Sequence, residues 1–328
     1  TFSLEMGPET AVFVPRGVAN GYQALEDGTA YTYLVNDHWS PEARASYTYL
    51  NLADETAAIA WPIPLSEAEI SDADKAHPRL ADVVPMKPAR TVVLGAKGQL
   101  GQSLMAILPD ATGIDRDELD LSDSEAVQAF NWNGVGTIIN AAAYTAVDVA
   151  ETEEGRKDCW AANVHAVANL VEVARERHAR LVHISSDYVF DGTAEEHSEN
   201  ETFSPLGVYG QTKAAGDALV ATLPQHYIVR TSWVIGGGKN FVGIMADLAG
   251  KGVKPTVVAD QFGRLTFTTD LAAGIKHLLD SKAEFGTYNL TNTGDVQSWA
   301  DIAKDVFVRS GKSADDVTPV TTEEYAAG

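Results

Sequence analysis

Three residues of this chain have the types and the spacing needed to give a proton to a carbonyl oxygen. Tyr209 and Lys213 are four positions apart, so on a helix they share one face. A lysine ammonium beside a phenol favours the phenolate, which lowers the tyrosine pKa from about 10 toward neutral pH and suits general acid catalysis. Ser186 follows an apolar run and can hydrogen-bond the same oxygen. We therefore predict Ser186, Tyr209 and Lys213 as catalytic residues.

A glycine-rich turn adds a binding site for a dinucleotide. Gly95-Ala-Lys-Gly98-Gln-Leu-Gly101 follows the strand-like residues 91–94 and precedes a helical pattern, which is the context that the dinucleotide fingerprint requires. The glycines allow a close backbone approach, and the helix N-terminus offers free N–H groups to a pyrophosphate. A Tyr-x-x-x-Lys spacing alone is typical of a surface helix. The order of fingerprint, serine, tyrosine and lysine favours a nicotinamide-dependent reductase, in which Lys213 also holds the ribose.

Two neighbouring residues of opposite charge bear on the choice between NADPH and NADH. Asp115 and Arg116 lie at the end of the second expected strand, about 20 residues beyond the fingerprint, where the ribose is recognised. Asp115 would accept a hydrogen bond from the 2′-hydroxyl of NADH, and Arg116 would pair with the 2′-phosphate of NADPH. Both NADH and NADPH therefore remain candidate cofactors. The stretch Asp120-Leu121-Ser122-Asp123 is expected to cap a helix and to lie near the adenine.

The composition narrows the class of protein. A formal net charge of −22 over 328 residues argues against nucleic acid or an anionic membrane surface as a partner. The single cysteine, Cys159, cannot form an internal disulfide, and no apolar run reaches the length of a membrane span. The eight histidines do not cluster at ligand spacing, so no metal site is expected. We expect a soluble cytoplasmic protein, and because its first residue is Thr1, a fragment of a longer chain.

The pattern of the sequence changes along the chain. Residues 1–65 alternate apolar and polar positions between turn signals, which predicts antiparallel β structure, and residues 66–89 are acidic and proline-bearing, as in a linker. Residues 90–328 alternate strands, at 91–94, 136–139, 179–184 and 226–230, with amphipathic helices. The predicted fold is α/β: a Rossmann-type doubly wound parallel sheet with a small substrate-binding lobe, preceded by the β segment. The acidic run 195–201 is expected to be a solvated loop.

Residues 90–328 resemble the dTDP-4-dehydrorhamnose reductases, a family of extended short-chain dehydrogenases. The resemblance rests on the fingerprint and on the motifs at 140–148, 183–192, 204–213, 230–233 and 260–263. It implies reduction of the 4-keto group of dTDP-4-dehydro-L-rhamnose to dTDP-L-rhamnose with NADPH or NADH. It also implies the catalytic residues Ser186, Tyr209 and Lys213, although the family usually has threonine at the first of these positions.

The same resemblance implies the remaining contacts. Cofactor contacts are expected at Gly95, Lys97, Gly98, Gln99, Leu100, Gly101, Asp115, Arg116, Asp120, Leu121, Ala141, Ala142, Ala143 and Lys213. Substrate contacts are expected at Tyr144, Ser185, Asp187, Tyr188, Trp233 and Asn240. The chain departs from the family at Arg264-Leu265, where many members have Pro-Thr. It also has Gln102 where some members have a glutamate of a metal-bridged dimer, so such a dimer is not expected.

Residues 1–65 resemble the C-terminal part of the dTDP-4-dehydrorhamnose 3,5-epimerases, which are cupin-like jelly rolls. The matching stretches include 14–22, 31–42 and 59–62. A family histidine is replaced by Asn20 and a supporting aspartate by Glu69, and the family's catalytic histidine and lysine would lie before Thr1. Bifunctionality with an epimerase is left open. So is a β segment that is purely structural or that mediates self-association.

Two other functions remain as alternatives. Another epimerase or dehydratase of the same superfamily would share the fingerprint and the Tyr-x-x-x-Lys spacing, but dehydratases carry a glutamate after the aspartate, where this chain has Tyr188. A non-catalytic, nucleotide-binding regulatory subunit is the second, since the reductases resemble the regulatory subunit of methionine adenosyltransferase. The intact serine, tyrosine and lysine favour the enzyme.

Overall fold

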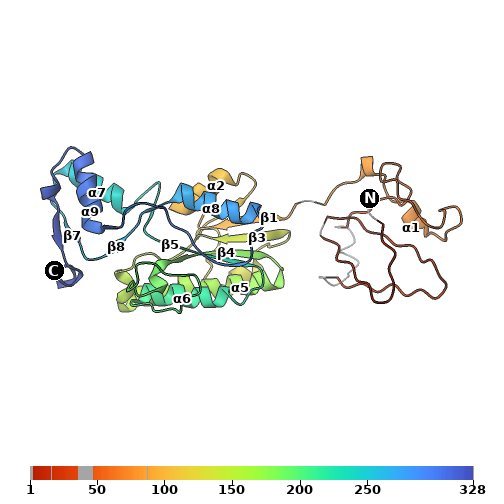
Figure 1. Cartoon of the computed structure of the whole chain (residues 1–328), viewed down its shortest axis with the longest axis horizontal. Coiled ribbons are helices and arrows are strands. Elements are labelled where there is room, and N and C mark those ends of the chain that lie inside the picture. The colour runs from red at the N-terminus through yellow and green to blue at the C-terminus, as the bar shows by residue number, and fades with distance from the viewer. Residues whose placement is uncertain (1–2, 16, 36–46, 87, 328) are drawn as a thin grey trace. The chain divides into compact units, whose positions relative to one another are not determined.

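The structure, a computed structural model, describes residues 3–15, 17–35, 47–86 and 88–327. The chain divides into two compact units, Thr1–Pro88 and Ala89–Gly328 (Figure 1). The division falls close to the start of the first strand of the α/β part. The second unit therefore contains all of the predicted catalytic and cofactor-binding residues.

The described residues of the first unit do not form the antiparallel sheet that the sequence predicts for residues 1–65. Among its described residues no strand is paired, and the regular elements are α1 (Asp72–Lys75) and the 3₁₀ turn η2 (Leu80–Asp82). Part of the predicted β segment, residues 36–46, lies outside the described residues. A half-buried sheet needs a layer to cover its apolar face. Here large apolar side chains such as Phe13 (88% exposed) and Leu34 (98% exposed) have no such cover.

Part of the predicted linker folds onto the first unit. The buried Asn51 donates from Nδ2 to the carbonyls of Lys75 (3.0 Å) and His77 (2.8 Å). The carboxylate of Asp54, also buried, accepts from the backbone N–H of Leu80 at 2.6 Å. Residues 75–80 are thus fixed by side chains some 25 positions earlier rather than by their own local pattern.

The second unit is built on a six-stranded parallel sheet in the order β2-β1-β3-β4-β5-β10. The chain begins at β1, moves outward to β2, and returns to the other side of β1 at β3. Strand order therefore reverses between β1 and β3, and ligands of such sheets bind at the carboxyl ends of the strands there. The strands are β1 (Arg90–Leu94), β2 (Thr112–Ile114), β3 (Val135–Asn140), β4 (Arg180–Ser186), β5 (His226–Thr231) and β10 (Gly286–Asn289).

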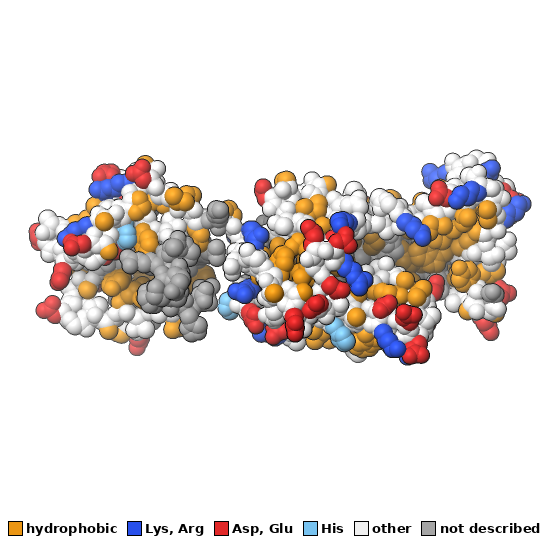
Figure 2. All heavy atoms as spheres, turned by 180° about the vertical axis from the view of Figure 1, so that it is seen from behind, with side chains coloured by type: hydrophobic (Ala, Val, Ile, Leu, Met, Phe, Trp, Pro, Cys, Tyr) orange, Lys and Arg blue, Asp and Glu red, His pale blue; other side chains and the backbone are white. Residues whose placement is uncertain are grey.

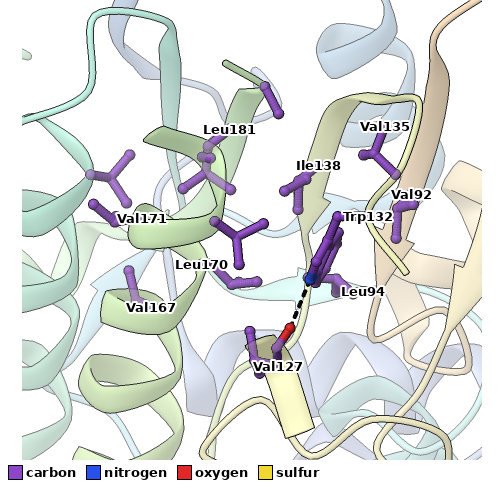
Figure 3. Close-up of a cluster of buried hydrophobic side chains, with 14 of the residues drawn as sticks. Val92, Leu94, Val127, Trp132, Val135, Ile138, Val167, Leu170, Val171 and Leu181 are labelled. Atoms are coloured by element: carbon purple, nitrogen blue, oxygen red, sulfur yellow. Dashed lines mark hydrogen bonds between the residues drawn. The ribbon is translucent and has the colours of Figure 1, made fainter. Parts of the chain in front are cut away.

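Helices cover both faces of this sheet (Figure 1). On one face, Val127, Leu170 and Val220 from three helices pack against strand residues, and the Trp132 indole N–H donates to the Val127 carbonyl at 2.8 Å (Figure 3). On the other face, Leu104 and Ile275 pack against a second set of strand residues. The first face carries α3 (Ser124–Ala129), α4 (Glu153–Trp160), α5 (Ala166–Glu176) and α6 (Val208–Val220), and the second carries α2 (Gln99–Ile107) and α8 (Thr268–Asp280).

A small lobe follows the sheet at the carboxyl ends of its strands (Figure 1). Met245, Ala249 and Phe307 form its core, and hydrophobic side chains gather on its surface toward the sheet (Figure 2). Its helices are α7 (Phe241–Lys251), α9 (Trp299–Arg309) and α10 (Thr322–Ala327). Its short strands pair as β6 (Val234–Ile235) with β9 (Thr266–Phe267), β7 (Thr256–Val258) with β12 (Thr318–Val320), and β8 (Phe262–Gly263) with β11 (Gln297–Ser298).

Short turns complete the second unit. They are the 3₁₀ turns η3 (Val149–Glu151), η5 (Asp187–Val189) and η6 (Ala314–Asp316), and the π-helical turn η4 (Ala161–His165), which joins α4 to α5. Within the described part of the chain, no helix combines the length and the hydropathy of a membrane span.

Candidate functional site

The structure brings the predicted catalytic residues together at the carboxyl end of β4. Ser186 is the last residue of that strand, and Tyr209 and Lys213 lie on consecutive turns of α6, which packs against it. The Ser186 hydroxyl lies near the Tyr209 phenol and lowers its pKa. Lys213 is 2% exposed, and its Nζ donates to the Ile184 carbonyl at 2.6 Å. This arrangement presents two hydroxyl donors to one point above the strand end.

The electrostatics of Tyr209 differ from the sequence-based prediction. Burial raises the pKa of the Tyr209 phenol, and the nearby Ser186 hydroxyl only partly opposes this rise. The prediction that Lys213 draws this pKa toward neutrality is wrong, because burial dominates and the Lys213 ammonium donates to a backbone carbonyl. Burial also lowers the pKa of Lys213 to about 8. Tyr209 therefore stays protonated at neutral pH, which is the form that a proton donor needs.

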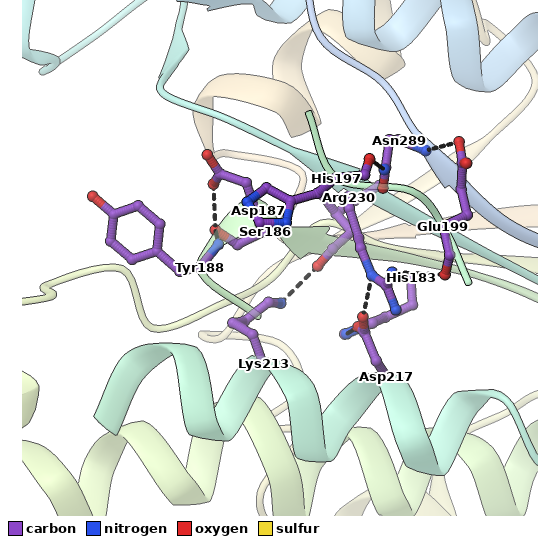
Figure 4. A network of polar contacts seen from close by, with 11 residues as sticks. His183, Ser186, Asp187, Tyr188, His197, Glu199, Lys213, Asp217, Arg230 and Asn289 are labelled. Atoms are coloured by element: carbon purple, nitrogen blue, oxygen red, sulfur yellow. Dashed lines mark hydrogen bonds and ion pairs between the residues drawn. The ribbon is translucent and has the colours of Figure 1, made fainter. Parts of the chain in front are cut away.

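Asp187 and Tyr188 lie beside the catalytic hydroxyls. The Ser186 hydroxyl donates to Asp187 Oδ1 at 3.1 Å and accepts from the Tyr188 backbone N–H at 3.2 Å (Figure 4). Burial raises the pKa of Asp187 to about 6. The Tyr188 ring meets the Tyr209 ring edge to face, with centroids 5.7 Å apart. Asp187 and Tyr188, two of the residues that the resemblance assigns to substrate, thus lie beside the Ser186 and Tyr209 hydroxyls.

Trp233 connects this site to the small lobe. Its backbone has φ = 36°, in the left-handed region that a bulky residue rarely adopts, at a cost of about 1–3 kcal/mol. Its indole stacks on Trp299 of α9 with ring centroids 3.7 Å apart, and it lowers the pKa of the nearby Tyr188 phenol. Gly263 lies so close that an added Cβ would meet the indole at 2.8 Å. Trp299 could not be predicted as part of this site, because nothing in its local sequence pattern relates it to a residue 66 positions earlier.

Tyr144 is fixed by a residue that the sequence analysis also missed. The buried Asn163 accepts from the Tyr144 backbone N–H at 2.9 Å and donates to the Tyr144 carbonyl at 3.2 Å. Its amide also donates to Thr212 Oγ1 on α6 at 3.1 Å. Asn163 lies in the π-helical turn η4, a feature frequent at functional sites. Such a turn leaves no signal in a hydrophobic periodicity.

Two expected substrate residues are placed differently. Ser185 is 4% exposed and lies beside Asp217 under the sheet, because successive residues of a strand face opposite sides. Its assignment to substrate is therefore corrected. Asn240 caps α7: its Oδ1 accepts from the Gly243 N–H at 2.9 Å, and its Nδ2 donates to the Gly236 carbonyl at 2.7 Å. The hydrogen bonds of the Asn240 side-chain amide therefore stabilise the loop that contains it.

The glycine-rich turn forms a cradle with no room for side chains. Gly95 has φ = 74°, and a Cβ there would lie 2.8 Å from the Ala142 backbone nitrogen. A Cβ on Gly101 would lie 2.1 Å from the Gly95 carbonyl oxygen. Gly98 begins α2 without a side-chain cap, so the first N–H groups of the helix, at Gln99 and Leu100, point out of an uncapped terminus. This geometry fits the pyrophosphate of a dinucleotide.

Charged residues surround the other end of the expected cofactor site. The Asp115 carboxylate accepts from the backbone N–H groups of Lys97 and Arg116, each at 2.8 Å. The Arg116 side chain is 83% exposed and lies 3.5 Å from Asp120 Oδ2, while Lys97 Nζ lies 2.8 Å from Asp117 Oδ2. The Asp115 carboxylate therefore supports the turn. The side chains of Lys97 and Arg116 form exposed ion pairs, which hold them only weakly in place.

The remaining expected cofactor residues lie along the same strand ends. Ala141 donates its N–H to the Leu94 carbonyl at 3.0 Å, and Ala142 donates to Asn140 Oδ1 at 3.2 Å. Ala143 is exposed, next to them. Leu121 instead packs against the core, and its carbonyl accepts from Asn169 at 2.9 Å. Among the described residues, no group of three or more His, Cys, Asp or Glu is arranged to hold a metal ion.

Comparisons with known families divide the chain at the same place as its structure. Residues 89–328 match the family described as the RmlD substrate binding domain, and residues 1–82 match the dTDP-4-dehydrorhamnose 3,5-epimerase family. Among curated proteins, a dTDP-4-dehydrorhamnose reductase of Aggregatibacter actinomycetemcomitans is 39% identical over 236 residues, which is 67% of this chain and 78% of that protein. A dTDP-4-keto-6-deoxy-D-glucose reductase of Streptomyces niveus is 37% identical, over 73% of this chain and 85% of that protein.

Solved structures give the same relationship. A dTDP-4-dehydrorhamnose reductase of Bacillus anthracis, in complex with NADP, has a TM-score of 0.67 and 36% identity, covering 73% of this chain and 86% of that one. A dTDP-4-dehydrorhamnose reductase of Clostridium acetobutylicum has a TM-score of 0.66 and 38% identity, covering 72% and 85%. The predicted Rossmann-type fold of the second unit is thus confirmed.

Proposed function

Because this chain belongs to the dTDP-4-dehydrorhamnose reductase family, we propose that it reduces the 4-keto group of dTDP-4-dehydro-L-rhamnose to give dTDP-L-rhamnose. The observation that carries the proposal is the meeting of Ser186, Tyr209 and Lys213 beside a glycine cradle of dinucleotide type. A non-catalytic regulatory subunit would have no need of a buried, protonated phenol near a second hydroxyl at that point.

The chain's own residues supply the proton and the orientation. NADPH or NADH, when bound along the glycine turn, supplies the hydride that the ketone carbon accepts. Tyr209 gives its proton to the ketone oxygen, and Ser186 donates a hydrogen bond to the same oxygen as negative charge develops there. The Lys213 ammonium lies under the site, where it can hold ribose hydroxyls and offset the charge left on Tyr209. Tyr188 and Trp233 form an aromatic wall on the sugar side.

Turnover of purified substrate tests this function. The chain is expected to oxidise reduced nicotinamide only when dTDP-4-dehydro-L-rhamnose is present, with dTDP-L-rhamnose as the product, as followed by absorbance at the nicotinamide band and by chromatography. The C3 and C5 epimer, dTDP-4-keto-6-deoxy-D-glucose, serves as the comparison substrate because a relative is named for it. Binding of nucleotide with no turnover of either sugar would instead favour the regulatory subunit.

We expect both nicotinamide cofactors to be used, with kcat/KM values within about a hundredfold of each other. Asp115 suits the NADH ribose but is engaged with the turn, and Arg116 is available for the 2′-phosphate of NADPH. Arg116→Ala should lower kcat/KM for NADPH by about tenfold, the value of one charge-assisted hydrogen bond, and leave NADH unchanged. Arg309→Ala, at an exposed position of α9, is the control. Equal losses with both cofactors would place Arg116 away from the phosphate.

A second activity is supported by the match of residues 1–82 to the epimerase family. We propose that this unit belongs to an epimerase part that produces the substrate of the reductase. Joining two consecutive enzymes raises the local concentration of an intermediate without requiring their sites to touch. Solvent deuterium uptake at C3 and C5 of dTDP-4-keto-6-deoxy-D-glucose, measured with a protein that also carries the epimerase histidine and lysine expected before Thr1, tests for this activity. If no exchange is found, the unit is structural or mediates self-association. Sedimentation velocity distinguishes these two roles.

We propose a dTDP-sugar as the partner of the site and a cytoplasmic location, with no nucleic acid or membrane bound. The formal charge of −22 supports this, because it disfavours polyanionic partners. A nucleoside diphosphate sugar is also an anion. It therefore depends on local positive potential, such as the uncapped start of α2, to enter the site.

A further inference from the structure

A buried ion pair lies one helical turn beyond Lys213, and the catalytic roles proposed above do not use it. Asp217 is 0% exposed and Arg230 is 5% exposed, and Arg230 Nε donates to Asp217 Oδ2 at 2.9 Å. Figure 4 shows the Lys213 and Asp217 side chains rising from the same side of α6 toward the sheet. Tyr209, Lys213 and Asp217 are spaced by four residues each, so one face of α6 carries all three.

Among the described residues, Asp217 is the carboxylate that raises the pKa of Lys213, whereas the buried Asp187 acts on Tyr209. Burial raises the pKa of Asp217, and the bound Arg230 opposes this rise. Cys159 of α4, His183 of β4 and Arg230 of β5 face the interior here, together with Tyr209, Lys213 and Asp217 of α6. Burial holds the pKa of His183 well below its ordinary value and raises the pKa of Cys159, so both are neutral. Two buried cations, Lys213 and Arg230, thus share one carboxylate. A buried cation without a counter-charge loses its proton readily or destabilises the fold.

Arg230 fixes the position of that carboxylate and of a second segment. Its Nη1 donates to the Glu199 carbonyl at 3.1 Å, and its guanidinium lies 5.2 Å and 5.1 Å from the ring centroids of Phe190 and Phe203. The Glu199 carboxylate also accepts from the Asn289 backbone N–H at 3.1 Å. The acidic run 195–201 is therefore anchored to the sheet at Glu199, where the sequence predicted a solvated loop. This run belongs to the connection between Ser186 and Tyr209.

We propose that Asp217 is a positioning residue for Lys213: held in place by Arg230, its carboxylate keeps the buried ammonium charged and directed at the Ile184 carbonyl, under Tyr209. The proposal rests on the proposed function for its catalytic consequence. Its electrostatic part concerns the cofactor-free protein alone. A carboxylate with a merely structural role would contribute to stability by the same amount at every pH at which the site titrates.

The first test measures the free energy of unfolding of the cofactor-free chain between pH 6.5 and 10.5. Lys213 has a folded pKa of about 8, below its ordinary value of 10.5. Between these values the unfolded state binds more protons, so this group makes stability rise with pH. Asp217→Asn should lower the folded pKa further, so that the rise begins about one pH unit earlier. Asp217→Glu keeps the charge and should restore the original onset.

The second test measures kcat against pH with a saturating 4-keto sugar and NADPH. If the charged lysine is needed, the basic limb of the profile should move about one unit lower in Asp217→Asn, a loss of about tenfold on that limb. Asp247→Asn, at an exposed position of α7, is the matched control and should leave both profiles unchanged. If the proposed substrate is wrong, the second test fails, while the unfolding measurement still decides the electrostatic part.

Removing one member of a buried pair can prevent folding. The double variant Asp217→Asn with Arg230→Gln removes both charges and leaves no unpaired ion from the pair. Because the lost carboxylate and the lost guanidinium act on Lys213 with opposite signs, a smaller shift to earlier onset is expected from it. Folded variants, single or double, that keep the wild-type pH dependence of unfolding would overturn the proposal.

Discussion

Replacing Tyr209 by phenylalanine is expected to lower kcat by a factor on the order of 10² or more while leaving cofactor affinity nearly unchanged. The ring would still pack edge to face against Tyr188, with centroids now 5.7 Å apart, so the shape of the site is kept. Only the phenol hydroxyl, and with it the proton donor near Ser186, is lost. Single-turnover kinetics, together with fluorescence titration of NADPH, measure the two quantities separately.

Tyr325→Phe provides the control for this substitution. Tyr325 lies on α10 and is 54% exposed, so loss of its hydroxyl should change neither quantity. If Tyr209→Phe kept the wild-type kcat, the proton would have to come from another group. Asp187, with its pKa raised to about 6, would be the first to examine.

The second large effect is expected at Gly101. An alanine Cβ there would lie 2.1 Å from the Gly95 carbonyl oxygen and 2.7 Å from the Ala96 Cα. Both are backbone atoms of the turn, so the turn itself must move, and a displacement of about 1 Å in a positioning element can cost about 10²-fold. We expect Gly101→Ala to weaken NADPH binding by that order, as measured by calorimetric titration.

Gly250→Ala is the matched control for Gly101→Ala. Gly250 also lies within a helix, α7, but no atom lies within 4 Å of its added Cβ. There alanine should leave NADPH affinity unchanged and stabilise the helix by about 0.5–1 kcal/mol. Equal affinities in the two variants would mean that the close contact at Gly101 relaxes without moving the phosphate cradle.

The parts of the fold that the sequence predicted are those whose signal is local. The strands around 91–94, 136–139, 179–184 and 226–230 are short apolar runs between amphipathic helices, and each is found, extended by one or two residues or trimmed by one at an end. The relation of Tyr209 to Lys213 follows from helical periodicity in the same way.

The parts that could not be predicted depend on tertiary contacts. Ser185 and Ser186 are alike in sequence, and only the register of β4 decides which of them faces the substrate side. Burial, and not Lys213, sets the pKa of Tyr209, and this could be predicted only if the surroundings of the phenol were known. Asp217 follows Lys213 by four residues, so its place on the same helix face could be predicted from the sequence. Its partner Arg230 was not, because the two meet only when α6 packs on the sheet.

The left-handed backbone of Trp233 has a consequence for how this protein can be altered. Glycine or asparagine would relieve the strain at that position, so a search for more thermostable variants should repeatedly select them there. Such variants would lose the indole that bridges Tyr188 and Trp299. If Trp233 contacts the sugar as proposed, heat resistance and substrate binding are in conflict at residue 233, and stabilising substitutions are better sought on surfaces remote from it.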